Sequence, residues 1–492
     1  MSERMRTETF TSFCVTSAFS ILFGQVSLAG QSMSMPGVEN SVGYQSSGTS
    51  IEPTVTSESA PMIHRSLGNW TVMFHANAFM VSLQQKGNRG TDKVFSTNWV
   101  MPMAVRQFGR HSLMFRTMLS AEPATVTNRK YPLLFQTGET AYGLSIIDAQ
   151  HPHDFVMELA AKYDFKIGER SQLFVYGGPV GEPALGPAAF PHRSSASENP
   201  LAVLGHHSQD STHLSNNVIT LGMTAGPVQL EASTFHGREP NENRWNIDKG
   251  KPDSFASRIT IAPRKSLSGQ FSIGRINQPE AIDPALDVIR TTASIHHNVR
   301  FASGHVSSSL IFGRNKDVKN GSPRIFDSYN LEITTKFRNK NWVWTRIENL
   351  DRDRSLVASQ KAPAPPTCLL CGLLGLPPVS PVQQLEGKSR EFSRIDDQPF
   401  KNDHIVLGPE GTPIVVEEIP IGRIQAYTLG YERELPLKLS SLNVGLGVQA
   451  TAYGVGPAFK SVYGSRSGTL AIFLRIRPAG NMMDHMRQMH QH

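Results

Sequence analysis

The stretch from Val288 to Arg300, VIRTTASIHHNVR, alternates two kinds of side chain along its whole length. Successive side chains of a β-strand point to opposite faces, so one face carries apolar residues such as Ile289 and Ile295. The other face carries polar and charged residues such as Arg290 and His296. This period of two predicts a β-strand with one apolar and one hydrated face.

The segment from Tyr329 to Arg338 repeats the alternation, with Leu331 and Ile333 on one face and Glu332 and Lys336 on the other. Such a strand fits a soluble β-sandwich or a membrane barrel. In a sandwich the apolar face packs against a second sheet, whereas in a barrel it contacts lipid. The alternation does not separate the two classes, but the connections between strands do.

Segments of strand character recur about sixteen times, within a range of about fourteen to eighteen. They are expected at residues 69–83, 94–107, 111–121, 157–167, 171–179, 216–225, 227–236, 254–262, 267–277, 288–299, 304–314, 325–337, 341–350, 423–434, 441–452 and 468–477. Connections after even-numbered strands are short, and those after odd-numbered strands are long, including 122–156, 180–215 and 237–253. Short periplasmic turns and long external loops are typical of a barrel, and a sandwich does not sort its connections in this way. The expected fold class is all-β, a closed antiparallel transmembrane β-barrel.

The N-terminus predicts export. Arg4 and Arg6 precede an apolar stretch, and Ser27-Leu28-Ala29 offers the small residues at which a signal peptide is cleaved. No other long apolar run follows, which excludes helical membrane spans. The expected organisation is a signal peptide at 1–29, a flexible N-terminal segment at 30–67, a barrel at 68–478 with a long external loop at 351–422, and a Met/His-rich tail at 479–492.

The mature chain keeps two cysteines, Cys368 and Cys371, in a Pro-rich segment. After export to an oxidising compartment, a small loop disulfide is the preferred interpretation; a metal site or disulfide exchange is the alternative. The formal charge of +7 is spread along the chain, so no nucleic-acid surface is expected.

This order of segments resembles the porin-like outer-membrane β-barrels of Gram-negative bacteria, from about Trp70 to Pro478. The motifs at 191–193, 206–213 (HHSQDSTH) and 236–240 (HGREP) resemble an uncharacterised bacterial envelope family that implies no activity. The resemblance implies a location in the bacterial outer membrane, with outer-membrane lipids, the barrel-assembly machinery and small solutes or ions as partners. The polar tail after the last strand departs from the aromatic-terminated strand that is common in porins.

Three external loops carry histidines, and two hypotheses apply to them. The first is that their imidazoles and carboxylates hydrogen-bond and brace the loops inside the barrel. The second is a metal site, because these donors suit a borderline metal. The candidate ligands are His151, His153, Asp154, His206, His207, Asp210 and His236.

The tail from Met482 to His492 is dense in methionine and histidine, and Met33 and Met35 lie at the other mature end. Thioether and imidazole groups suit copper(I), so copper is the candidate metal here, against an unstructured tail with incidental methionines. The candidate ligands are Met483, His485, Met486, Met489 and His490.

An enzyme hypothesis rests on His213-Leu214-Ser215-Asn216, which resembles the HxSN pattern of outer-membrane phospholipases and lipid A deacylases. That resemblance implies Ser215 as nucleophile and His213 as base, on one strand face. The match spans four positions, and Asn217 stands where the phospholipases have glycine.

The hydrated strand faces predict a charged lumen. The expected pore-lining residues are Arg116, Glu231, Arg258, Arg275, Arg290, Glu332, Lys336, Arg346 and Glu348. The function expected from these features is a porin-like channel for small solutes or ions, with a link to copper traffic. The alternatives are an outer-membrane lipid hydrolase and a plugged binding or structural barrel.

Overall fold

The structure is a computed structural model that describes residues 43–59, 62–318, 323–353, 356, 404–407, 413–416, 421–437 and 441–479. The expected signal peptide, the cysteine pair Cys368 and Cys371, most of the loop 351–422 and the Met/His-rich tail from residue 480 lie outside the described residues. Within the described ranges, every helix is too short or too polar to cross a membrane.

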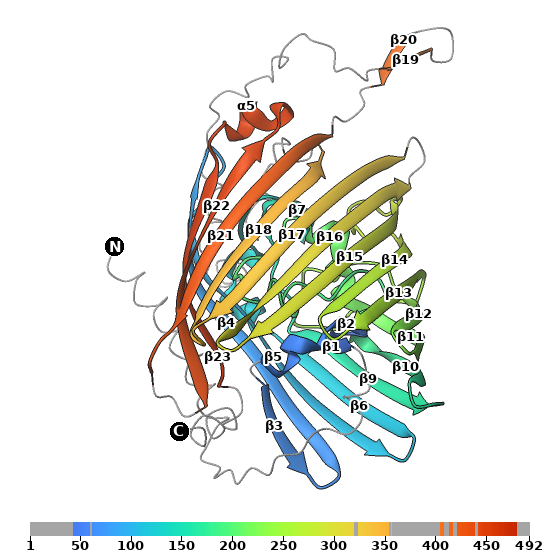
Figure 1. The fold of residues 1–492 in the computed structure, drawn as a ribbon. Coiled ribbons are helices and arrows are strands. Elements are labelled where there is room, and N and C mark those ends of the chain that lie inside the picture. The colour runs from blue at the N-terminus through green and yellow to red at the C-terminus, as the bar shows by residue number, and fades with distance from the viewer. Residues whose placement is uncertain are drawn as a thin grey trace, which may run out of the picture. The chain divides into compact units, whose positions relative to one another are not determined.

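Sixteen antiparallel strands close into a barrel, as the sequence predicts (Figure 1). They are β4 (Trp70–Lys86), β5 (Lys93–Phe108), β6 (His111–Leu119), β9 (Val156–Lys166), β10 (Ser171–Gly181), β11 (Ser215–Ala225), β12 (Val228–His236), β13 (Ser254–Arg264), β14 (Leu267–Asn277), β15 (Asp287–Phe301), β16 (Gly304–Val318), β17 (Arg324–Phe337), β18 (Asn341–Arg352), β21 (Gly422–Glu434), β22 (Leu442–Val455) and β23 (Gly468–Pro478). Strand β23 pairs with β4 and closes the ring, from Gly468 opposite Lys86 to Ile476 opposite Ala78. Each backbone edge inside the ring thereby finds a partner.

The remaining described elements are short. They are β1 (Gly43–Ser47), β2 (Ser50–Pro53), η1 (Thr54–Ser59), β3 (Met62–Leu67), α2 (Glu122–Thr125), η2 (Thr127–Arg129), β7 (Tyr131–Ala141), β8 (Leu144–Gln150), α3 (His206–Gln209), η3 (Ser211–His213), β19 (His404–Leu407), β20 (Pro413–Val416), η6 (Pro457–Phe459) and α5 (Lys460–Tyr463). Strand β3 pairs with the first residues of β4, below the part of β4 that β23 meets.

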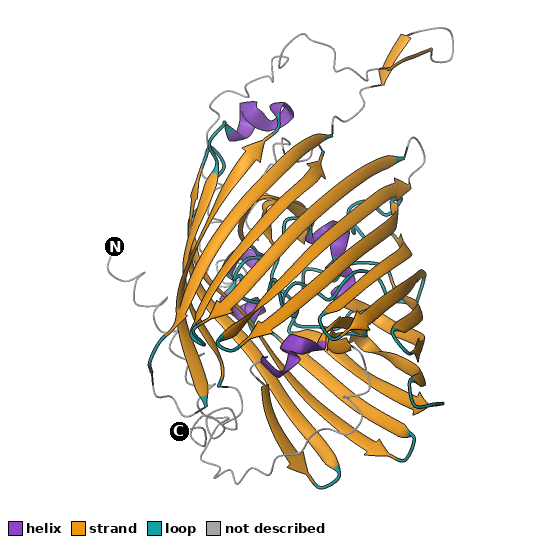
Figure 2. Ribbon diagram, viewed as in Figure 1, coloured by secondary structure: helices purple, strands orange, loops and turns teal. Residues whose placement is uncertain are grey.

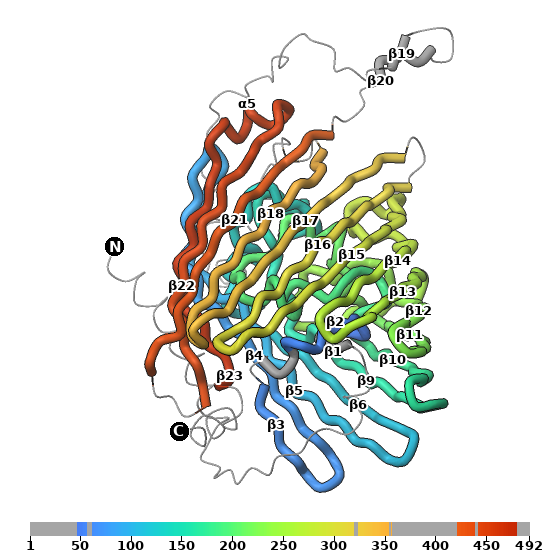
Figure 3. Tube along the Cα trace, viewed as in Figure 1, coloured from blue at the N-terminus to red at the C-terminus, as the bar shows by residue number. Residues whose placement is uncertain are grey.

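The connections separate by barrel end. In Figure 3 the tight turns, such as β5–β6 and β15–β16, lie at one end, and the β22–β23 connection with α5 lies at the other. The long connections after β6, β10 and β12 join strands at that second end. The predicted parity of short and long connections is confirmed.

The strand faces are sorted as a lipid-embedded barrel requires. On β13, Phe255 is 63% exposed and Ile261 is 47% exposed, whereas Arg258 and Thr260 between them are buried. On β15, Arg290 and His296 are buried and Ile295 is exposed, as the alternation predicts. A water-soluble barrel would not expose its apolar side chains around the outside, so the polar residues line the lumen and the apolar ones suit lipid.

Three segments occupy the lumen, and Figure 2 shows their short helices and loops within the ring of strands. The first is the N-terminal segment 43–59, where β2 lies against β13, β14 and β15. The second is the connection 120–155, which carries α2 and the hairpin β7–β8. The third is the connection 182–214, where α3 lies against β15, β16 and β17.

Segment 30–67 was expected to be flexible, but residues 43–59 form β1, β2 and η1 inside the barrel, and 62–67 form β3. Polar residues such as Ser47 and Ser50 show no apolar alternation, yet they are buried because charged groups inside the barrel supply their hydrogen bonds: Glu182 for both serines, and Arg258 of the wall for Ser50. A hydrophobic pattern cannot detect a segment that is held by polar contacts.

Candidate functional site: the filled lumen

The connection 182–214 is joined to the wall through Arg193. Its Nε donates to Glu332 Oε2 of β17 at 2.8 Å, and its Nη1 donates to Asp210 Oδ2 at 2.9 Å. Asp210 Oδ1 lies 2.6 Å from Nδ1 of His206, one turn away. All four side chains are buried. A guanidinium between two carboxylates satisfies charges that would otherwise be very unfavourable away from water, so this connection is fixed to the wall.

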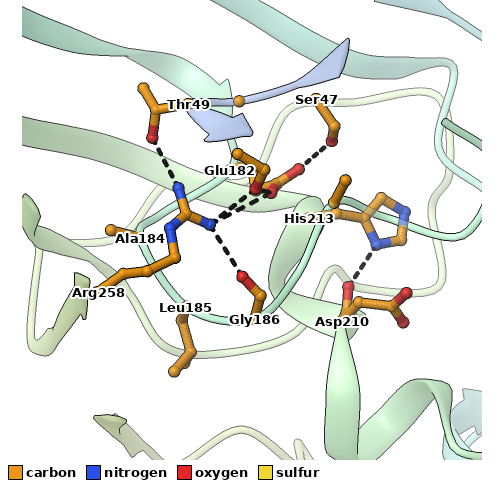
Figure 4. Close-up of polar contacts among 12 residues, drawn as sticks. Ser47, Thr49, Glu182, Ala184, Leu185, Gly186, Asp210, His213 and Arg258 are labelled. Carbon is orange, nitrogen blue, oxygen red and sulfur yellow. Dashed lines mark hydrogen bonds and ion pairs between the residues drawn. The ribbon is translucent and has the colours of Figure 1, made fainter. Parts of the chain in front are cut away.

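A second junction, at Arg258 of β13, joins the wall to the N-terminal segment and to the connection 182–214 (Figure 4). Its Nε donates to Glu231 Oε2 of β12 at 2.8 Å, which is a contact within the wall. Its Nη1 donates to Ser50 Oγ at 2.7 Å and to the Gly186 carbonyl at 2.9 Å. Its Nη2 donates to Thr49 Oγ1 at 2.9 Å. One side chain therefore holds the N-terminal segment and the connection 182–214 together.

Glu182 completes this junction. Ser50 Oγ donates to Glu182 Oε1 at 2.7 Å, and Ser47 Oγ donates to Oε2. Gly48 between the two serines has a φ of +50°, and a Cβ there would lie 2.6 Å from Glu182 Cβ, so only glycine fits this turn. Burial raises the pKa of Glu182 to about 7, although Arg258 and the two serine hydroxyls act to lower it. Its charge therefore changes near neutral pH.

The histidine-rich motifs converge in the lumen. The imidazole centroids follow one another from His151 to His207 at 5.8 Å, to His206 at 5.2 Å, to His213 at 5.1 Å and to His153 at 5.4 Å. His151 and His153 belong to one loop. His206, His207 and His213 belong to another, which lies more than fifty positions later in the sequence. The structure brings them into one row.

Acidic groups stand beside most of these imidazoles. His151 Nε2 lies 2.9 Å from Glu139 Oε1, and His153 Nδ1 lies 3.1 Å from Glu122 Oε1. Arg244, from the β12–β13 connection, donates to Asp154 Oδ1 at 3.0 Å and also contacts Glu139. The connection 120–155 is therefore also tied to the connection after β12.

The pKa values follow from this enclosure. Burial lowers the pKa of His207 to about 4, and burial also holds the pKa of His213 well below its usual range. Burial acts to lower the pKa of His153 too, but Glu122 outweighs it and the net shift is upward. Burial raises the pKa of Asp154 to about 7, in spite of Arg244. The pKa values of neighbouring imidazoles in the row are therefore shifted in opposite directions.

The candidate metal ligands of the loops have protein partners instead of a common centre. His206 contacts Asp210, His207 lies 3.4 Å from Glu239, and His236 lies 3.3 Å from Asp253 at the end of β12. Among the residues that the structure describes, no three His, Cys, Asp or Glu side chains are placed to share one ion. These contacts agree with the bracing hypothesis for the loop histidines.

The candidate hydrolase pair makes other bonds. Ser215 opens β11, but its Oγ donates to the Thr212 carbonyl at 2.9 Å. His213 lies in η3 and not on the strand, and its Nδ1 lies 2.9 Å from the Asp210 carbonyl (Figure 4). The 3₁₀ turn breaks the alternation that was expected to put both side chains on one strand face. Both residues are buried among the inserted loops.

The predicted pore-lining residues face the interior, with one exception. Arg116, Glu231, Arg258, Arg290, Glu332, Arg346 and Glu348 are buried on the inner face, and Lys336 shares the parity of Glu332 on β17. Arg275 is the exception and needs correction. Its side chain is 63% exposed and pairs with Asp287, because it shares the parity of the outward-facing Phe271 and Ile273 on β14.

Sequence reasoning placed the histidine-rich loops inside the barrel, but it missed the residues that fix the inserted segments there, including Arg193, Glu182 and the N-terminal serines. Only the motif at 191–193 was noted, without a partner for its arginine. The signal that could have found them is the excess of charged residues on the inner strand faces. A charge inside a narrow lumen is unfavourable unless it is paired, so unpaired wall charges predict partners from another segment.

No family model and no curated protein matches this chain. Several solved structures are similar to it over most of their length. OmpF of Salmonella typhi, in a complex with daunomycin, is similar with a TM-score of 0.45 and 7% identity, over 84% of this chain and 100% of that one. An anion-selective porin from Comamonas acidovorans has a TM-score of 0.41 and 10% identity, over 83% and 99%. OmpT of Vibrio cholerae has a TM-score of 0.41 and 7% identity, over 84% and 100%.

Proposed function

We propose that this chain is a porin-like channel of the bacterial outer membrane, narrowed by its own inserted segments and passing only small solutes or ions. The observation that carries the proposal is the sorting of side chains in a closed ring of sixteen strands. Apolar side chains face outward, and charged, hydrogen-bonded side chains face inward. A ring of this size encloses a space wide enough for water unless other segments fill it.

The inserted segments set the expected width. Arg193, Arg258 and Arg352 each join a wall strand to an inserted loop. The third of these contacts runs from Arg352 Nε of β18 to the Phe135 carbonyl at 2.8 Å. Loops that fold into a barrel in this way form its constriction. We therefore expect small, well-defined conductance steps, with a plugged barrel as the alternative.

The test is single-channel recording of the refolded mature protein in a planar bilayer, beside the variant Arg193→Met. This change removes the contact of the connection 182–214 with Glu332 of the wall, and the contact with Asp210 inside the same connection. We expect small steps from the natural protein and several-fold larger or noisier steps from the variant. Arg275→Met is the matched control, because that arginine faces outward.

Two outcomes would overturn the proposal. One is a folded natural protein and a folded Arg193→Met variant that are both silent, which would favour the plugged barrel. The other is an Arg193→Met variant whose steps equal those of the Arg275→Met control. Closed-barrel folding is checked in each case by protease resistance of the strands.

The copper link stays a prediction, because its tail ligands lie outside the described residues. The hydrolase also stays a prediction. Its test is lipid turnover by the natural protein and by Ser215→Ala.

A further inference from the structure

Four side chains with soft or neutral donor atoms lie near one level of the inner wall. His75 of β4 stands directly opposite Met101 of β5. The register of β5 and β6 runs from Val100 opposite Leu119 to Met103 opposite Arg116, which sets Met101 opposite Met118. Residues that face each other across antiparallel strands have Cβ atoms about 4.5–5.5 Å apart. Three neighbouring strands thus present an imidazole and two thioethers in one row.

The fourth side chain comes from an inserted segment. His192, in the connection 182–214, places its Nε2 3.0 Å from the Sδ of Met118. Met101 is 1% exposed, Met118 is 3% exposed and His192 is 7% exposed, so these three side chains are enclosed, and His75 is half-buried. Residues from the wall and from the inserted connection therefore meet at Met118.

The surroundings are also soft and aromatic. Trp99 of β5 contacts both imidazoles, with ring centroids 4.7 Å from His75 and 4.4 Å from His192. One rung further along the same inner face, Met73 stands opposite Met103, and both are buried. The adjacent cation, Arg116, is already paired with Glu158 at 2.8 Å. Glu158 of β9 stands directly opposite Met118, and its carboxylate is the one held by Arg116.

Two ring nitrogens in this group lack a hydrogen-bond partner. Nδ1 of His75 and Nδ1 of His192 are both buried without one in the described part of the chain. A buried polar atom without a partner is unfavourable and calls for an explanation, of which an ion is one.

We propose that His75, Met101, Met118 and His192 form a binding site for a soft monovalent cation, copper(I) or silver(I), on the inner wall of the barrel. The two thioether donors favour such soft ions over calcium and magnesium, which prefer oxygen ligands, and over zinc, whose sites are built from thiolate, imidazole and carboxylate. Methionine has three rotatable bonds, so the thioethers can move apart to admit an ion. The Trp99 indole adds a π face beside the cation.

This site is separate from the loop histidines and from the tail. Its residues are not among the ligands that the sequence patterns suggested, and it does not depend on whether the lumen conducts. A failure of the conductance experiment would therefore leave it standing, and a failure to bind metal would leave the channel standing.

The experiment uses the full-length refolded protein in detergent. Silver(I) is titrated while tryptophan fluorescence is recorded, and copper(I) affinity is measured by competition with a chromophoric chelator. The test variant is Met101→Leu with Met118→Leu. The matched control is Met80→Leu with Met223→Leu, because both of those methionines are exposed on the outer face. Methionine-to-leucine changes nearly conserve volume, so folding should be retained.

We expect the natural protein and the control to bind one more equivalent of metal ion than the test variant. If the test variant still binds this equivalent, its affinity should be more than about tenfold weaker. The fluorescence change should disappear in Trp99→Phe, and zinc should not produce it. Equal stoichiometry and affinity in test and control variants would overturn the proposal, as would a fluorescence response that survives Trp99→Phe. If the double variant does not fold, Met118→Leu alone decides the question by the same comparison.

Discussion

At the scale of single residues, the lumen is governed by the need to pair buried charges. Alternation alone turns Arg258 and Glu332 inward, but their full complement of partners comes from segments far away in the sequence. Glu332 meets Arg193, 139 positions earlier, and Arg258 meets Ser50, 208 positions earlier. Removing one partner of such a pair leaves an uncompensated charge, so the pairs hold the inserted segments in place.

The junction at Glu182 predicts a pH dependence. The pKa of this carboxyl rises from an ordinary 4.5 to about 7 on folding, chiefly through burial. The folded protein therefore retains a proton that the unfolded chain releases. The resulting stability is complete below the ordinary value and is lost as the pH rises through about 7. Glu182→Gln, which cannot ionise, should lack this loss.

The measurement is thermal or denaturant unfolding at about pH 5 and about pH 8. From the lower to the higher pH, the free energy of unfolding of the natural protein should fall by up to about 3 kcal/mol more than that of the variant. Asp287→Asn is the control, because Asp287 pairs with the exposed Arg275 outside the lumen. Parallel pH profiles for the natural protein and Glu182→Gln would contradict the assignment.

At the scale of elements, the sixteen strands follow from local pattern. Each expected strand is present, and the ends differ by a few residues, as for β16, which continues to Val318 where residue 314 was expected. The short hairpins β1–β2 and β7–β8 were not expected. They lie inside the barrel and are held by contacts to the wall and to other loops, so their own sequences carry no clear alternation.

Strand packing also depends on glycines that face aromatic rings across a strand pair. Gly430 of β21 stands opposite Trp344 of β18, and a Cβ at Gly430 would lie 2.0 Å from the indole. Trp344 is buried and donates to Gln449 at 2.9 Å, so it has little freedom to move. Gly430→Ala should lower the free energy of unfolding by about 1–3 kcal/mol through overpacking.

Denaturant unfolding of the folded barrel measures this effect. Gly168→Ala, in the β9–β10 turn, is the control, since a Cβ there meets only Ser171 at 3.7 Å or beyond. A Gly430→Ala variant as stable as the Gly168→Ala control would show that the indole moves aside at no cost.

At the scale of the whole molecule, the outer surface carries the membrane proposal. Leu221 lies midway along β11 and is 58% exposed, with Ile219 and Met223 beside it on the same face. A cation placed there would meet hydrocarbon if this face contacts lipid. Leu221→Arg should then lower the free energy of unfolding from lipid vesicles by about 2–4 kcal/mol.

The control is Leu67→Arg, at the end of the β3–β4 hairpin, where Leu67 is 66% exposed. The same charge near the membrane surface should cost no more than about 1 kcal/mol. Equal, small effects at both positions would mean that the belt around β11 does not contact lipid.

The sequence by itself determined the strand positions, the face of nearly every pore-lining residue and the parity of the connections. These features depend on a period of two and on turn composition, which are local. Only the tertiary structure decided that segment 43–59 enters the lumen, which residues hold the connections 120–155 and 182–214 there, and that His75, Met101, Met118 and His192 meet. Those contacts depend on ring closure by β23 and β4 and on cross-strand register, which join residues that no local pattern relates.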